Sequence, residues 1–291
     1  MIYSYSLHQI LDPSNCTFSP SDYSLFKFGD TKFALKFAEE LFNGFIQLNS
    51  ELILAQTEIV LLPSPYYSIP TASNFLCKYF KDFLNEFLFQ NGREACKESK
   101  IHRIQTYIED YGNMNFEERI NLISNDSYYL DEHFISNKFC IFLDDIKITG
   151  SHEKTINRIL NKHNVKGKFF FIYYAELTNP KVHPNIENYF NYYRVKNEDD
   201  IIRIINSKWF CFNTRIIKYV LMLRSEKFEF ILKSISPKKR KELFDLAISN
   251  NYHLIQEFQS NILKINQKQL WQLTSKKDKE KVLIHPNLQL G

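Results

Sequence analysis

Residues 140–151 of this chain have the sequence Cys-Ile-Phe-Leu-Asp-Asp-Ile-Lys-Ile-Thr-Gly-Ser, which decides the fold class. The four apolar residues 140–143 lack alternating polarity and are typical of a central strand covered on both faces. Ligands of open α/β sheets bind just beyond the carboxyl ends of the strands, where we expect Asp144 and Asp145 to lie. We expect a helix from about Ser151. The stretch therefore predicts an α/β fold with a ligand site at this strand end.

A turn of small and hydroxylated residues, Thr149-Gly150-Ser151, follows the acids. Its amides and hydroxyls, beside the positive end of a helix, are suited to a monophosphate. Glycine permits close backbone approach, and the chain has only 7 among 291 residues. Carboxylates accept from ribose hydroxyls, but both acids can serve one diol only if the strand is already turning. The alternative is a strand with a polar end and a glycine turn.

The same string resembles the phosphoribosyl-pyrophosphate (PRPP) signature of the type I phosphoribosyltransferases. It has four apolar residues, two acids, an apolar residue and a small-residue turn that ends in Thr-Gly. The resemblance implies a mostly parallel sheet flanked by helices, in which Asp144 and Asp145 hold the ribose 2′- and 3′-hydroxyls. The candidate residues for the 5′-phosphate are then Lys147, Ile148, Thr149, Gly150, Ser151 and His152.

Three of these residues depart from the pattern of the family. Lys147 stands where an aliphatic residue is common, Ile148 replaces a small or hydroxylated residue, and His152 replaces a Thr or Ser. The last two changes remove hydroxyls, so backbone amides and His152 would carry more of the phosphate binding. His152 and Glu153 are the only histidine and acid pair that we would test.

A transferase that uses PRPP must also hold pyrophosphate, which leaves as a magnesium complex. The strand expected at 57–62 runs into a proline-rich loop, whose candidate contacts are Ser64, Pro65 and Tyr66. The alternative is a rigid proline turn with surface tyrosines. Mg²⁺ would arrive with PRPP, and the only protein groups that we expect to reach it are Asp144 and Asp145.

Cations for the pyrophosphate are expected between the two loops. Arg103 is the first choice because a guanidinium can fork two phosphate oxygens, and Lys100 is the second. The segments 103–105 (Arg-Ile-Gln) and 118–122 (Glu-Arg-Ile-Asn-Leu) resemble the arginine-containing segments of the ComF-like branch. The resemblance covers roughly residues 57–176. The alternative for each arginine is an ordinary solvated helix face.

The order of elements predicts two domains. We expect an α/β domain over 1–190, with its core at 57–176 and an N-terminal strand and helix within 1–50. A mainly helical C-terminal lobe would follow over 191–291. Residues 1–28 look extended, and Gly29-Asp30-Thr31 is a good helix start. Other helices are expected up to about Gln90, near 152–163 and from Ser236-Pro237, with a strand at 168–175.

Composition narrows the function classes. The net charge of only +4 argues against an extended nucleic-acid surface, although a local one stays open. No apolar run approaches the ~18 residues that span a bilayer, and no signal-peptide pattern begins the chain. The five cysteines are scattered, which favours reduced thiols in the cytoplasm. The resemblance adds a small-molecule substrate and a homodimer as expected partners.

Three functions are compatible with these patterns. The first is an enzyme of nucleotide metabolism that transfers phosphoribose from PRPP to a nitrogen acceptor, a nucleobase above all, and for which Asp145→Asn should abolish turnover with little loss of fold. The second is a regulatory or defence module that senses PRPP or a nucleotide without turnover. The third is a hydrolase of nucleotide N-glycosidic bonds.

Overall fold

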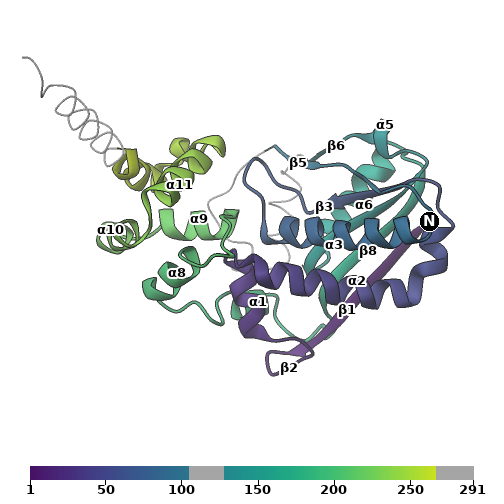
Figure 1. The fold of residues 1–291 in the computed structure, drawn as a ribbon, viewed down its shortest axis with the longest axis horizontal. Coiled ribbons are helices and arrows are strands. Elements are labelled where there is room, and N and C mark those ends of the chain that lie inside the picture. Colours follow the sequence, from purple (N-terminus) through teal and green to yellow (C-terminus); the bar gives the residue numbers. More distant parts are fainter. Residues whose placement is uncertain (105–127, 267–291) are drawn as a thin grey trace, which may run out of the picture. The chain divides into compact units, whose positions relative to one another are not determined.

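The computed structural model describes residues 1–104 and 128–266, which form the fold in Figure 1. Its contacts divide the chain into two compact units, Met1–Ile216 and Ile217–Gly291. The predicted division into domains at residue 190 stays a prediction. No helix within the described ranges is long and apolar enough to cross a membrane.

A six-stranded sheet is the centre of the first unit. Its strands are β1 (Ile2–Asp12), β2 (Asn15–Cys16), β3 (Ile59–Pro63), β4 (Lys97–Glu98), β7 (Lys138–Lys147) and β8 (Gly167–Leu177). They lie in the order β2-β1-β8-β7-β3-β4, and every neighbouring pair except β1–β2 is parallel. This confirms the predicted mostly parallel α/β sheet. A separate antiparallel pair joins β5 (Ile101–Arg103) to β6 (Tyr128–Leu130).

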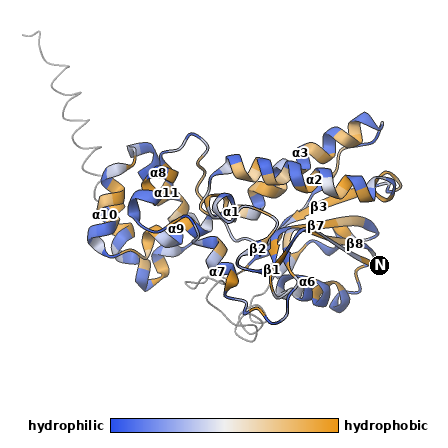
Figure 2. Ribbon diagram, turned by 90° about the horizontal axis from the view of Figure 1, so that it is seen from below, coloured by the Kyte–Doolittle hydropathy of each residue, from blue (hydrophilic) through white to orange (hydrophobic). Residues whose placement is uncertain are grey.

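Helices cover both faces of this sheet, as Figure 2 shows for the apolar strands β3, β7 and β8. On one face, α2 (Thr31–Leu54) and α3 (Ala72–Gln90) pack against Ile141 and Leu143 of β7. On the other face, α6 (Ser151–Lys162) and the β5–β6 pair pack against Cys140 and Phe142. Because both faces are covered, the strands are apolar without alternation, as predicted for residues 140–143.

Most of the predicted elements are confirmed, because their start signals work locally. Asp30 caps α2 by accepting a hydrogen bond from the Lys32 backbone N–H (3.1 Å). Thr71 and Asn74 form a capping box at the start of α3. Shorter helices follow in the first unit, α5 (Glu132–Ile135), α7 (Ile186–Asn191) and α8 (Glu198–Ile205).

Two expectations were wrong. Residues 1–28 are not extended throughout, because Pro20–Lys27 forms the helix α1, in which the Ser19 side chain accepts from the Asp22 N–H (3.2 Å). The central strand does not end before the two acids either. It continues to Lys147, because β8 pairs with it as far as Lys147 and Glu176, whereas β3 ends with Pro63 opposite Leu143.

The second unit is helical, as predicted for the C-terminal lobe. It holds most of α9 (Thr214–Leu221), α10 (Ser225–Ser234), α11 (Pro237–Ser249), a short 3-10 helix (Tyr252–Leu254) and helical residues 256–266. Helix α11 begins as expected, with Ser236 as its cap and Pro237 in its first turn. The core of the second unit includes Phe228, Leu243 and the edge-to-face pair of Tyr252 and Phe258.

The helix α2 offers a matched pair of substitutions for testing its packing. Phe45 is fully buried against the rings of Tyr5, Phe80 and Phe170, whereas Leu48 is 73% exposed. Phe45→Ala should lower the free energy of unfolding by about 3–5 kcal/mol, because it leaves a cavity in the core. Leu48→Ala should change it by less than about 0.5 kcal/mol. Urea unfolding measures both, and equal losses would contradict this packing.

Candidate functional site

The two acids lie next to each other in β7, with their carboxyl groups in contact. The Asp145 backbone N–H donates to Asp144 Oδ1 at 2.8 Å, and the two side chains also share a hydrogen bond. Asp145 is buried, and Asp144 keeps part of its surface. Binding of one ribose diol by both acids required a strand that is already turning, but the strand that carries them is still paired with β8.

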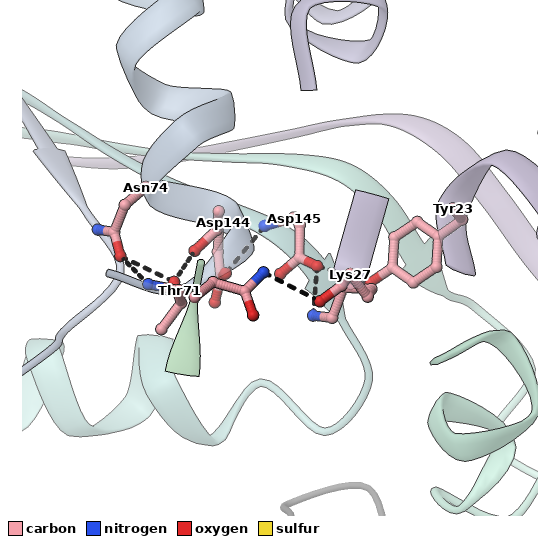
Figure 3. Close-up of polar contacts among 8 residues, drawn as sticks. Tyr23, Lys27, Thr71, Asn74, Asp144 and Asp145 are labelled. Carbon is pink, nitrogen blue, oxygen red and sulfur yellow. Dashed lines mark hydrogen bonds and ion pairs between the residues drawn. The ribbon is translucent and has the colours of Figure 1, made fainter. Parts of the chain in front are cut away.

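Asp145 is held by two side chains of α1, which point toward it in Figure 3. Its Oδ2 atom lies 2.5 Å from Lys27 Nζ and accepts a hydrogen bond from the Tyr23 hydroxyl at 2.7 Å. The Lys27 and Asp145 side chains are only 11% and 6% exposed, so this is a buried ion pair. Tyr23 and Lys27 are four residues apart and therefore share one helix face. Neither residue was among the predicted site residues.

Helix α1 is fixed in place by the segment that follows the sheet. The Ser24 hydroxyl donates to the Asn191 carbonyl at 2.8 Å and accepts from the Arg194 N–H at 3.0 Å. The Asn213 side-chain amide donates to the Lys27 carbonyl at 3.1 Å. These contacts come from residues far away in sequence, and they hold the Lys27 ammonium against the acid.

Burial and the Lys27 charge give the two acids opposite pKa shifts. Burial, together with the neighbouring Asp145 charge and hydrogen bond, raises the pKa of Asp144 to about 8. Burial also opposes ionisation of Asp145, but the Lys27 charge and hydrogen bonds from Asp144, Lys27 and Tyr23 outweigh it and lower the pKa of Asp145. Near neutral pH the pair therefore holds about one proton. With Lys27, the group of three is close to neutral.

The turn after β7 leads directly into the N-terminus of α6. Gly150 is the N-cap of α6 and has φ 67° and ψ 15°, the left-handed region that favours glycine. The Thr149 and Ser151 hydroxyls are 2.5 Å apart, and Ser151 is buried in the first turn. The helix N-terminus thus lies six residues after Asp144, with two hydroxyls at its entrance.

The other predicted phosphate contacts have different surroundings. Lys147 Nζ lies 3.0 Å from Glu153 Oε2 and 3.2 Å from Glu176 Oε1, so its ammonium pairs with two carboxylates. Ile148 packs against the apolar core beneath α2 and α3. The His152 ring lies 6.3 Å from the Tyr128 ring of β6. Side-chain binding of phosphate by Lys147 would require those ion pairs to open.

The loop after β3 brings the remaining predicted residues together. Ser64 and Pro65 are buried, and the nearby Ser64 hydroxyl acts to lower the pKa of Asp144. Tyr66 bridges to β5, because the Arg103 N–H donates to its carbonyl at 3.1 Å. Lys100 Nζ lies 3.9 Å from the centroid of the Tyr66 ring.

The contacts of Tyr66 connect the loop expected to bind pyrophosphate to Arg103 and Lys100, the cations expected to bind it. Arg103 Nη2 donates to the Tyr128 hydroxyl at 3.3 Å, and Lys100 donates to the Tyr67 carbonyl at 2.8 Å. Burial lowers the pKa of Lys100. The arginine-containing segment 118–122 lies outside the described residues.

Asp144 and Asp145 are the side chains predicted to reach a magnesium ion that arrives with PRPP, and this stays a prediction. Across residues 1–104 and 128–266, no group of three His, Cys, Asp or Glu side chains is arranged to bind a metal. Asp145 already binds Lys27 and Tyr23, which leaves Asp144 as the acid with surface to offer.

The chain belongs to the ComF-like phosphoribosyltransferases, since the family model described as PRTase ComF-like matches residues 1–265. The match therefore extends well beyond the stretch 57–176 that carries the resemblance in sequence. A comparison with curated proteins found no significant match.

Several solved phosphoribosyltransferases are similar to this chain at low identity. An adenine phosphoribosyltransferase is 10% identical over 48% of this chain and 70% of its own, with a TM-score of 0.30. A hypoxanthine phosphoribosyltransferase from Staphylococcus aureus is 13% identical over 48% and 74%, with a TM-score of 0.29. The adenine phosphoribosyltransferase of Saccharomyces cerevisiae is 9% identical over 55% and 74%, with a TM-score of 0.28.

The buried ion pair changes the expectation for substitutions of Asp145. Asp145→Asn keeps the shape but leaves the Lys27 ammonium buried without a carboxylate, so we expect a loss of about 3–5 kcal/mol in the free energy of unfolding. The double variant Lys27→Met/Asp145→Leu should unfold close to wild type, because apolar groups of similar volume replace both charges. Urea unfolding of the two variants measures this difference. A harmless Asp145→Asn would contradict the pairing.

The opposite pKa shifts predict how stability depends on pH. The pKa of Asp144 is higher in the folded state, so its contribution is full below its ordinary value of 3.8 and is lost as pH rises through about 8. The pKa of Asp145 is lower in the folded state, so its contribution is lost only as pH falls below 3.8. Asp144→Asn should therefore flatten the decline in stability between about pH 4 and pH 8. Parallel urea-midpoint profiles for variant and wild type would refute this assignment.

Proposed function

We propose that this protein binds PRPP with Mg²⁺ and transfers its phosphoribosyl group to a nitrogen acceptor, a nucleobase in the first instance. Family membership supports the class of reaction. The single observation that carries the proposal is the left-handed Gly150 at the N-terminus of α6, six residues after Asp144 and flanked by the Thr149 and Ser151 hydroxyls. This arrangement suits a ribose 5-phosphate.

In the proposed reaction, the 5′-phosphate binds the first amides of α6 and the neighbouring hydroxyls. Asp144 contacts a ribose hydroxyl, and Asp145 orients it through their shared hydrogen bond. The acceptor nitrogen forms a bond to the anomeric carbon, the bond to pyrophosphate breaks, and pyrophosphate leaves with the electron pair. The acceptor proton passes to solvent.

Arg103 and Lys100 are proposed to stabilise the departing pyrophosphate. Both are joined to the loop after β3, through the Tyr66 carbonyl and the Tyr66 ring respectively. Negative charge grows on the leaving group in the transition state, so fixed cations there lower the barrier. Bound Mg²⁺ would supply further positive charge at the pyrophosphate oxygens.

A second function is a PRPP sensor that binds without turnover, and the ion pair of Asp145 favours it. Asp145, one of the two acids predicted to hold the ribose, already accepts hydrogen bonds from Lys27 and Tyr23. Only Asp144 then remains for the hydroxyls unless α1 moves. The described cysteines form no disulfide, which is compatible with the proposed cytoplasmic location.

A matched pair of glycine variants tests the phosphate site. Gly150 and Gly92 have nearly the same φ, 67° and 66°, and a Cβ meets only Lys147 Cε at 3.6 Å in the first case and nothing within 4 Å in the second. Each change to Ala should cost about 1–2 kcal/mol of stability. Only Gly150→Ala should also weaken PRPP binding in calorimetry, by about tenfold. Equal PRPP affinity in both variants would contradict the site.

Product analysis separates the three functions. Wild-type protein with PRPP, Mg²⁺ and a panel of nucleobases should release pyrophosphate only when the correct base is present. Binding without release under every condition would favour the sensor. Release of ribose phosphate from a nucleotide without an added base would favour the hydrolase, and failure to bind PRPP would overturn the proposal.

A further inference from the structure

A buried lysine is paired with one of the two acids at which the sugar phosphate is proposed to bind. PRPP and ribose 5-phosphate carry several negative charges, which repel ionised carboxylates unless a cation lies between them. In this protein one cation is already part of the chain, since Lys27 Nζ lies 2.5 Å from Asp145 Oδ2. A positive charge there reduces the repulsion before any ion binds.

The Lys27 ammonium is held in a fixed position. Its side chain is 11% exposed, so salt screens the pair much less than it screens a surface pair. The Asn213 amide binds the carbonyl of Lys27, and Ser24 in the same helix contacts residues 191 and 194. Tyr23 donates to the same carboxylate oxygen as Lys27. A divalent ion could reach that oxygen only by displacing both donors.

We propose that Lys27 is the resident cation of this site, and that it neutralises Asp145 so that the ribose 5-phosphate part of the ligand binds without a divalent ion at the acids. Mg²⁺ is then required for the pyrophosphate alone. Lys27 acts through Asp145 and is a positioning residue. This inference rests on the proposed function, and it concerns the charge balance of the site and not the reaction.

Ribose 5-phosphate is the probe that isolates the acids, because it lacks the pyrophosphate. Its affinity for the full chain is measured by calorimetry, once in EDTA and once in Mg²⁺. For wild type we expect the two affinities to agree within about threefold. For Lys27→Met we expect binding in EDTA to weaken about tenfold or more, the effect of losing one charged partner, and Mg²⁺ to restore most of it.

Lys36→Met is the matched control. This lysine pairs with Asp22 at 2.9 Å, and its side chain is 47% exposed on α2, so its loss removes the same charge without touching the acids. Its affinities should equal those of wild type. Rescue by Mg²⁺ separates the proposed role from a structural one, because a distorted site would bind poorly in both buffers.

Two further arms keep the inference testable if Lys27→Met does not fold. The double variant Lys27→Met/Asp145→Leu lacks both charges and should bind ribose 5-phosphate in EDTA as well as in Mg²⁺. If wild type binds ribose 5-phosphate only in Mg²⁺, Lys27 does not replace a divalent ion at the acids, and the proposed function is unaffected. Unchanged EDTA binding by Lys27→Met would lead to the same conclusion. Absence of binding by wild type in both buffers would overturn both the resident cation and the proposed function.

Discussion

The buried ion pair between Lys27 and Asp145 is the interaction on which the rest of this site depends. Two charges removed from water are stable only when each is paired and hydrogen-bonded, and here the Tyr23 hydroxyl completes the shell of Asp145. The pair fastens α1 to the central strand. Beside this pair, burial and then the charge of Asp145 raise the pKa of Asp144.

This constraint joins parts of the chain that are distant in sequence. Helix α1 carries the cation, β7 carries the acids, and residues 191–213 hold α1 through Ser24 and the carbonyl of Lys27. The first residue of α2 extends the connection, since the Thr31 N–H donates to the Trp209 carbonyl at 2.9 Å. The site is therefore built from the beginning, the middle and the later part of the first unit, which agrees with a family match that spans residues 1–265.

Much of the fold could be predicted from the sequence because its signals are local. Three short stretches each predict the local structure that they form. They are the apolar run at 140–143, the cap at Asp30 and the Thr-Gly-Ser turn. Helix α1 was not predicted, although Ser19, Pro20 and Asp22 form a usual helix start. The pairing of Lys27 with a residue 118 positions later could not be found, since nothing in a single sequence reports such a contact. The strand end was misplaced for the same reason, because it depends on pairing with β8.

The central claim is that a sugar phosphate binds between Asp144 and the N-terminus of α6 while Lys27 stays on Asp145. A crystal structure of the protein with ribose 5-phosphate in EDTA tests it most directly. The account predicts the phosphate against the backbone amides at Gly150 to His152, a ribose hydroxyl on Asp144, and an intact Lys27–Asp145 pair. A phosphate bound elsewhere, or Asp145 turned away from Lys27 to hold the ribose, would contradict it.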